Sequence, residues 1–190
     1  RWWWTWWTPP ALSWTAGSEA EMGLPIPTAP RLRSGSLRVL VLGYGNPGRR
    51  DDGLGPRLAE ELSRMALPGV DVDSAYQLQA EDAAAVADHV VVVFVDADVS
   101  CPDPFEMRSI LPAGEPRFST HSLAPETVLS MAWKYLEAKP EAYVLAIRGE
   151  DFDGFGEGLS DRARRNLSAA LGFIEEFLEE RTSSCEKAST

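Results

Sequence analysis

Two adjacent carboxylates follow a glycine-rich turn in the segment LVLGYGNPGRRDDGLG, which runs from Leu40 to Gly55 and holds Asp51 and Asp52. A glycine-rich turn after a first strand is typical of a phosphate site. Two acids at its end argue against one, because they would repel a pyrophosphate where bare backbone N–H groups are needed. The same acids suit a metal ion, an activated water or a polarised peptide bond.

Asp52 is the acid of this pair that we assign to chemistry. Both acids stand near the N-terminus of a predicted helix, where the helix dipole favours an ionised carboxylate. A helix cap needs only one of them, so we assign the cap to Asp51 and leave Asp52 for other work. The supporting residues of the turn are Gly43, Gly45, Asn46, Asp51 and Gly53.

A third carboxylate, Asp96, ends the most apolar strand of the chain. Six apolar residues, 90–95, precede it, which predicts that its side chain is partly buried. Burial of a lone carboxylate raises its pKa or demands a partner, so we favour a functional role over the capping of a loop. Asp98 would share its face if the strand continued, but we expect the strand to have ended and Asp98 to be solvated.

The chain has two histidines, His89 and His121. His89 begins a strand away from the expected site and is predicted to be a surface or capping residue. His121 lies in a polar loop, and ligands of open α/β sheets gather at the carboxyl ends of the strands. Asp52, Asp96 and His121 could therefore form an open site for a divalent transition metal. Alternatively, the two acids share a proton and activate water.

Strands and helices alternate along residues 37–181, which predicts a mostly parallel sheet covered on both faces, a three-layer α/β/α fold. Apolar periodicity predicts strands over 37–42, 70–75, 89–97, 105–111 and 142–147. It predicts helices over 53–67, 79–88, 124–139 and 161–181, the last capped by Ser160.

Composition limits the partners of the protein. The 190 residues carry a formal net charge of −11, which disfavours nucleic acid and anionic membranes. No apolar run approaches the ~20 residues of a membrane helix. The two cysteines, Cys101 and Cys185, stand in no metal or redox spacing, so we expect a reducing cytoplasm.

The two ends differ from this pattern. Residues 1–36 contain six of the seven tryptophans and are otherwise rich in Pro, Ser, Thr and Gly, with no helical or strand period. We predict that they are disordered or non-native, residues 1–21 above all, because Met22 is the first methionine. Residues 37–181 are expected to form a single α/β domain, and 182–190 a flexible tail.

Three motifs in order resemble those of the hydrogenase maturation endopeptidases. They are the Gly-rich turn with its Asp-Asp-Gly-Leu-Gly continuation (43–55), the strand end Phe-Val-Asp-Ala (94–97) and Thr-His-Ser-Leu (120–123). The resemblance covers about residues 37–180. It implies a twisted five-stranded sheet between helices. It also implies removal of the C-terminal extension from the large subunit of a nickel–iron hydrogenase once the nickel is inserted.

The resemblance also implies roles for individual residues. Asp52, Asp96 and His121 take the metal-contacting positions, with Asp52 and Asp96 catalytic, and the nickel belongs to the precursor, so the resting enzyme can be free of metal. The family is also treated as an aspartic-type peptidase, which fits the two-acid alternative. The Asp52 position is often glutamate in relatives, so aspartate would make its contact at shorter reach or through water.

Three other functions compete with this one. A peptidyl-tRNA hydrolase shares the turn Gly-Asn-Pro-Gly (45–48) but needs a histidine soon after it, and none precedes His89. A dinucleotide-binding module fits the glycine spacing, with Asp73 for a ribose, but Pro47 and two acids precede the helix. A non-catalytic nickel-binding assembly protein would differ from the peptidase only in leaving its partner uncut.

Overall fold

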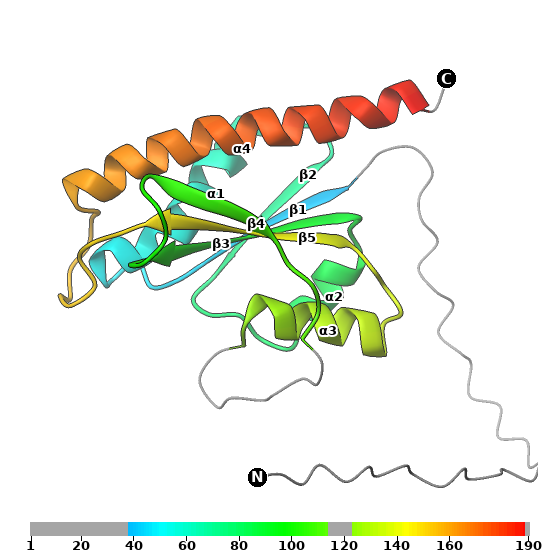
Figure 1. Ribbon diagram of the computed structural model, residues 1–190, viewed down its shortest axis with the longest axis horizontal. Coiled ribbons are helices and arrows are strands. Elements are labelled where there is room, and N and C mark those ends of the chain that lie inside the picture. Colours follow the sequence, from blue (N-terminus) through cyan, green and yellow to red (C-terminus); the bar gives the residue numbers. More distant parts are fainter. Residues whose placement is uncertain (1–37, 114–122, 189–190) are drawn as a thin grey trace, which may run out of the picture. The chain divides into compact units, whose positions relative to one another are not determined.

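A computed structural model of the chain describes residues 38–113 and 123–188 (Figure 1). Its sheet has five strands in the order β2-β1-β3-β5-β4. The pairs β1–β2, β1–β3 and β3–β5 are parallel, and only β4 runs antiparallel, against β5. The predicted mostly parallel five-stranded sheet is therefore confirmed. The strands are β1 (Val39–Tyr44), β2 (Val70–Ala75), β3 (Val91–Asp98), β4 (Phe105–Ser109) and β5 (Glu141–Arg148).

Helices cover both faces of the sheet, so the three-layer architecture is confirmed as well. In Figure 1, α1 and α4 lie on one face, and α2 and α3 lie on the other. The helices are the short 3₁₀ helix η1 (Arg50–Gly53), α1 (Leu54–Met65), α2 (Asp82–Ala87), α3 (Pro125–Tyr135) and α4 (Asp161–Ala188).

The two-residue period of the strands builds the two halves of the core. Along β1, Val39 and Val41 pack among residues of α1 and α4, whereas Leu40 and Leu42 pack among residues of α2 and α3. Successive side chains of a strand point to opposite faces, so a strand buried on both sides must be apolar throughout. This places β1 and β3 in the centre of the sheet, and their carboxyl ends at its middle.

Several boundaries differ from the predicted ones. The helix expected from residue 53 starts as η1 and becomes α-helical only at Leu54. The predicted end of the last helix at Arg181 is wrong, because α4 continues to Ala188. Ser160 caps this helix as predicted, since its Oγ accepts the N–H of Ala163 at 3.1 Å. The domain limit at residue 37 stays a prediction, because the described residues begin at 38.

Candidate active site

The turn between β1 and η1 is held close to the sheet by glycines. A Cβ on Gly45, which has φ of +138°, would stand 2.1 Å from the carbonyl oxygen of Asp52. A Cβ on Gly43 would stand 2.2 Å from the carbonyl oxygen of Gly55. Only glycine permits such an approach. The glycines thus pack the Asp52 turn and the start of α1 against the end of β1.

Asn46 fixes the shape of this turn and contacts Asp52. The Asn46 side-chain oxygen accepts the N–H of Gly48 at 2.9 Å, and its amide group donates to the hydroxyl of Tyr76. The backbone N–H of Asn46 donates to Oδ2 of Asp52 at 3.3 Å. Asp52 is half-buried, and this is the one hydrogen bond to its carboxylate that the described residues make. Most of its bonding capacity stays available.

Asp96 lies at the carboxyl end of β3, in a less polar environment. Its Oδ1 accepts the N–H of Ala97 at 2.8 Å. Burial raises the pKa of Asp96 to about 6, and the negative charge of Asp52 adds to the rise, while a hydrogen bond from Tyr44 opposes it. Burial, together with the charge of Asp96, raises the pKa of the Tyr44 hydroxyl well above its usual range. Asp96 is therefore more readily protonated than an ordinary aspartate.

Asp52 and Asp96 line the same cavity, which has a volume of about 250 Å³. Asp96 lies in the last part of β3, whereas Asp52 lies in η1, after the turn that follows β1. Residues that the sequence did not single out complete the wall. They include Tyr44, Arg49, Tyr76, Gln77, Leu78 and Leu123. Tyr44 stands between the two glycines of the turn, and the spacing of the glycines alone does not predict a role for its side chain.

The third predicted member of the site, His121, lies outside the described residues. Within 38–113 and 123–188, no group of three His, Cys, Asp or Glu side chains could hold a metal ion. The described part of the chain thus supplies two acidic groups and no complete metal centre. The catalytic roles of Asp52 and Asp96, and the metal contacts of these two acids and His121, remain predictions.

His89, predicted to be a surface or capping residue, is buried with 8 % of its area exposed. Its Nδ1 lies 2.6 Å from the carbonyl oxygen of Ala85, in the last turn of α2, and its Nε2 lies 2.9 Å from Oδ2 of Asp71. His89 is therefore a capping residue, one of the two alternatives predicted for it. Asp71 of the neighbouring strand β2 gives its ring a second partner.

Asp51 does not cap the helix that follows it, so that prediction is wrong. Its carboxylate is fully buried and accepts four hydrogen bonds from the segment between β5 and α4. The donors are the N–H groups of Glu150 at 2.9 Å, Asp151 at 3.0 Å and Ser160 at 2.7 Å, and the hydroxyl of Ser160 at 2.8 Å. Burial raises the pKa of Asp51, but these donors outweigh it and hold the pKa below the usual value.

Backbone contacts join the same two segments. The N–H of Asp51 donates to the carbonyl of Asp151 at 3.0 Å, and that of Arg50 donates to Gly156 at 3.1 Å. The N–H of Gly156 returns to the carbonyl of Gly48 at 2.9 Å. The loop over residues 149–158 is therefore fastened to the turn that carries Asp52.

Asp98 also departs from expectation, because β3 does not end before it. Its Oδ1 accepts the hydroxyl of Ser100 at 2.7 Å and the N–H of Cys101 at 3.1 Å. These hydrogen bonds hold the pKa of Asp98 below its usual value. Asp98 shapes the turn after β3 and does not line the cavity of Asp52 and Asp96.

The remaining features bear on the competing functions. The α-helix after β1 starts only at Leu54, beyond the glycines, and Oδ1 of Asp73 accepts the N–H of Ser74 at 2.7 Å. Both observations disfavour a dinucleotide site of the usual kind, which needs a helix that opens within the glycines. No helix in the described ranges is both long and apolar enough to span a bilayer.

The fold is similar to several solved structures. A nickel–iron hydrogenase maturation protease HycI from Thermococcus kodakarensis KOD1 is 25% identical, with a TM-score of 0.60 over 77% of this chain and 95% of that one. A hydrogenase 2 maturation peptidase from Thaumarchaeota archaeon SCGC_AB-539-E09 is 25% identical, with a TM-score of 0.55 over 74% and 97%. The hydrogenase maturating endopeptidase HybD from E. coli is 22% identical, with a TM-score of 0.59 over 75% and 93%.

These likenesses rest on structure. No protein-family model matches the sequence, and neither does any curated protein. The structural matches nevertheless cover nearly the whole of each solved chain and agree with one another in the kind of protein they identify. The resemblance read from the three sequence motifs is thus confirmed in three dimensions: the chain has the fold of the hydrogenase maturation proteases.

Proposed function

We propose that the protein is an endopeptidase that removes the C-terminal extension of a nickel–iron hydrogenase large-subunit precursor after nickel insertion, in the cytoplasm. The observation that carries the proposal is the pair of carboxylates, Asp52 of η1 and Asp96 of β3, which line one cavity. The two structural relatives at 25% identity, described as a maturation protease and a maturation peptidase, support the same activity.

The substrate's nickel would be recognised by Asp52, Asp96 and His121. Leu123 lines the cavity, and His121 stands two residues before it in the sequence. Carboxylates and an imidazole suit a divalent transition metal and leave coordination positions to the ligands it already has. A precursor without nickel would lack the atom that docks it, so cleavage would report that the metal centre is complete.

A proton would compete with the metal for Asp96 in this scheme. The raised pKa of Asp96, about 6, means that the carboxyl is partly protonated in weak acid, and a metal must displace that proton to bind. The same pKa supports the second route, in which Asp52 and Asp96 share a proton and activate the attacking water. Either way, both acids are required.

The decisive experiment incubates the protein with a nickel-loaded large-subunit precursor and follows the precursor's intact mass. We expect a loss of mass at its C-terminus, and none from the same precursor without nickel. Asp52→Asn, Asp96→Asn and His121→Ala should each abolish the cut. Asp88→Asn is the matched control, because Asp88 is exposed at the end of α2 and does not line the cavity.

The outcomes separate the competing functions. Full activity in all three site variants would end the proposal. Nickel-dependent binding of the precursor with no change in mass would instead support a non-catalytic assembly protein. Hydrolysis of peptidyl-tRNA would support the competing function of a peptidyl-tRNA hydrolase, although the net charge of −11 opposes binding of a nucleic acid.

A further inference from the structure

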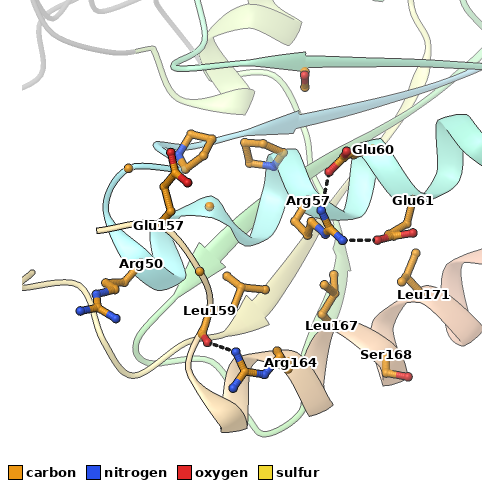
Figure 2. A pocket seen from close by; sticks show the side chains of 16 residues that line it. Arg50, Arg57, Glu60, Glu61, Glu157, Leu159, Arg164, Leu167, Ser168 and Leu171 are labelled. Atoms are coloured by element: carbon orange, nitrogen blue, oxygen red, sulfur yellow. Dashed lines mark hydrogen bonds and ion pairs between the residues drawn. The ribbon is translucent and has the colours of Figure 1, made fainter. Parts of the chain in front are cut away.

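A hollow of about 850 Å³ between α1 and α4 is separate from the candidate site (Figure 2). It shares no lining residue with the cavity of Asp52 and Asp96. Several of its charged side chains are engaged with one another, and Figure 2 shows Arg57 in contact with Glu60 and Glu61, each at 2.7 Å. The smaller cavity, in contrast, contains a hydroxyl group whose proton is not engaged.

This hydroxyl belongs to Tyr76, which follows β2 and lines the cavity with 63 % of its area exposed. Its oxygen accepts a hydrogen bond from the side-chain amide of Asn46. A tyrosine hydroxyl can also donate one hydrogen bond, and residues 38–113 and 123–188 contain no acceptor for it. The phenol is thus held in place through its oxygen, while its proton stays available to a ligand.

Asn46 connects this hydroxyl to Asp52. The side-chain oxygen of Asn46 accepts the N–H of Gly48 at 2.9 Å, which orients the amide so that its N–H₂ group faces Tyr76. The backbone N–H of Asn46 donates to Oδ2 of Asp52 at 3.3 Å. Because one residue bonds to both groups, the hydroxyl of Tyr76 is positioned relative to the carboxylate of Asp52.

The described residues supply three further side-chain donors to the cavity, Tyr44, Arg49 and Gln77. Tyr44 uses its single proton in a hydrogen bond to Asp96. The guanidinium of Arg49 is directed toward the loop over 149–158, where it donates to the carbonyl oxygen of Phe152 at 3.0 Å. No hydrogen bond from the described part of the chain fixes the amide of Gln77. The remaining donor of the wall, the hydroxyl held by the turn, is both fixed and unused.

We propose that Tyr76 is a catalytic residue whose hydroxyl donates a hydrogen bond to the carbonyl oxygen of the peptide bond that is cut. The inference rests on the proposed function and adds one group to it. Negative charge develops on this oxygen during hydrolysis, and ionised acids in the same cavity repel it. A donor that is in position before the reaction stabilises such a charge without the cost of reorganisation.

The hydrogen bond from Tyr76 acts while the peptide bond is hydrolysed. The oxygen of a water molecule adds to the carbonyl carbon, and the π electrons of the C=O bond move onto the carbonyl oxygen, which accepts the hydrogen bond. One proton of the water passes to a carboxylate of the cavity. When the C=O bond forms again, the C–N bond breaks, and the nitrogen takes up that proton and leaves as the amine of the C-terminal extension. Tyr76 keeps its own proton throughout.

The test is Tyr76→Phe, which removes the hydroxyl and keeps the ring. With nickel-loaded precursor, we expect kcat to fall at least about tenfold at nearly unchanged KM, because the hydrogen bond is strongest once charge has developed on the oxygen. Tyr135→Phe is the matched control, since Tyr135 ends α3, is similarly exposed at 60 % and does not line the cavity. It should cut the precursor as the wild type does.

Each outcome bears on Tyr76 or on the function. Equal kcat in Tyr76→Phe and the wild type would overturn the inference and leave the proposed function standing. A rise in KM at unchanged kcat would overturn it too, because the hydroxyl would then contact only the bound precursor. A loss of kcat in Arg49→Gln, with none in Tyr76→Phe, would assign the donor to Arg49 instead. If the wild type does not cut the precursor, the proposed function fails and the inference with it.

Discussion

Asp51 and Asp52 are neighbours in the chain, yet they lie in opposite environments. Asp51 is fully buried and accepts four hydrogen bonds from the segment before α4. Asp52 faces a cavity and accepts one long hydrogen bond from the N–H of Asn46. A carboxylate whose oxygens are fully used by donors stabilises the fold. A carboxylate with unused oxygens, beside a second acid, can act on a ligand.

The largest effect on activity should come from a change in Asp52, the acid that faces the cavity. Asp52→Asn keeps the size of the side chain and removes its charge, so we expect activity on the nickel-loaded precursor to fall at least about 100-fold. The free energy of unfolding should change by less than about 0.5 kcal/mol, because the residue is half-buried and contributes little to packing. Mass-resolved cleavage and urea unfolding measure the two quantities. Activity near that of the wild type would place the chemistry elsewhere.

A change in the buried Asp51 should instead lower the stability of the fold more than the activity. Asp51→Asn turns two acceptor oxygens into one oxygen and one N–H₂ group, which then faces N–H donors. We expect the free energy of unfolding to fall by about 3 kcal/mol, and the protein that remains folded to cut faster than Asp52→Asn. Asp153→Asn, an exposed acid of the same loop, is the control and should unfold like the wild type. A stable but inactive Asp51→Asn would contradict the division of roles.

The stability contributions of Asp96, in the cavity, and of the buried Asp51 should change with pH in opposite directions. Asp96 has a folded pKa of about 6, above the ordinary 3.8, so its contribution is full below pH 3.8 and is lost as the pH rises through 6. The lowered pKa of Asp51 gives a contribution that is present above pH 3.8 and is lost on acidification.

Asp96→Asn should therefore become more stable relative to the wild type as the pH rises from 4 to 7. The shift of Asp96 from 3.8 to about 6 corresponds to a gain of up to about 3 kcal/mol, with smaller values expected where water reaches the carboxyl. Urea unfolding of both proteins across this pH range measures the difference. A constant difference would mean that Asp96 is ionised throughout and that its environment is more polar than its burial indicates.

Local pattern in the sequence was enough to predict the layers of the fold and two of the acids. The apolar run before Asp96 places that carboxylate at a strand end, and the glycine-rich turn before Asp52 places the second one just beyond β1; the carboxyl ends of parallel strands share one edge of the sheet. The role of Asp51 could not be predicted in this way, since its partners stand 99 to 109 residues further along the chain. The burial of His89 could not be predicted for the same reason, because its partner Asp71 belongs to a different strand. A local motif predicts where a carboxylate stands in the chain, but tertiary contacts decide whether its oxygens already accept hydrogen bonds.

The smallest effect tests how finely the cavity tunes Asp96. Tyr44→Phe removes the hydroxyl whose hydrogen bond lowers the pKa of Asp96, so that pKa should rise above about 6, with a cost of about 1 kcal/mol for the lost bond. Tyr76→Phe is the matched control, because Tyr76 lines the same cavity but its hydroxyl bonds to Asn46. Carboxyl titration by NMR would measure both variants. If the Asp96 midpoint moves upward in Tyr44→Phe and not in Tyr76→Phe, the hydroxyl of Tyr44 helps to set the protonation of Asp96. Equal midpoints would mean that burial and the charge of Asp52 set the pKa of Asp96, and that Tyr44 only fills space beside it.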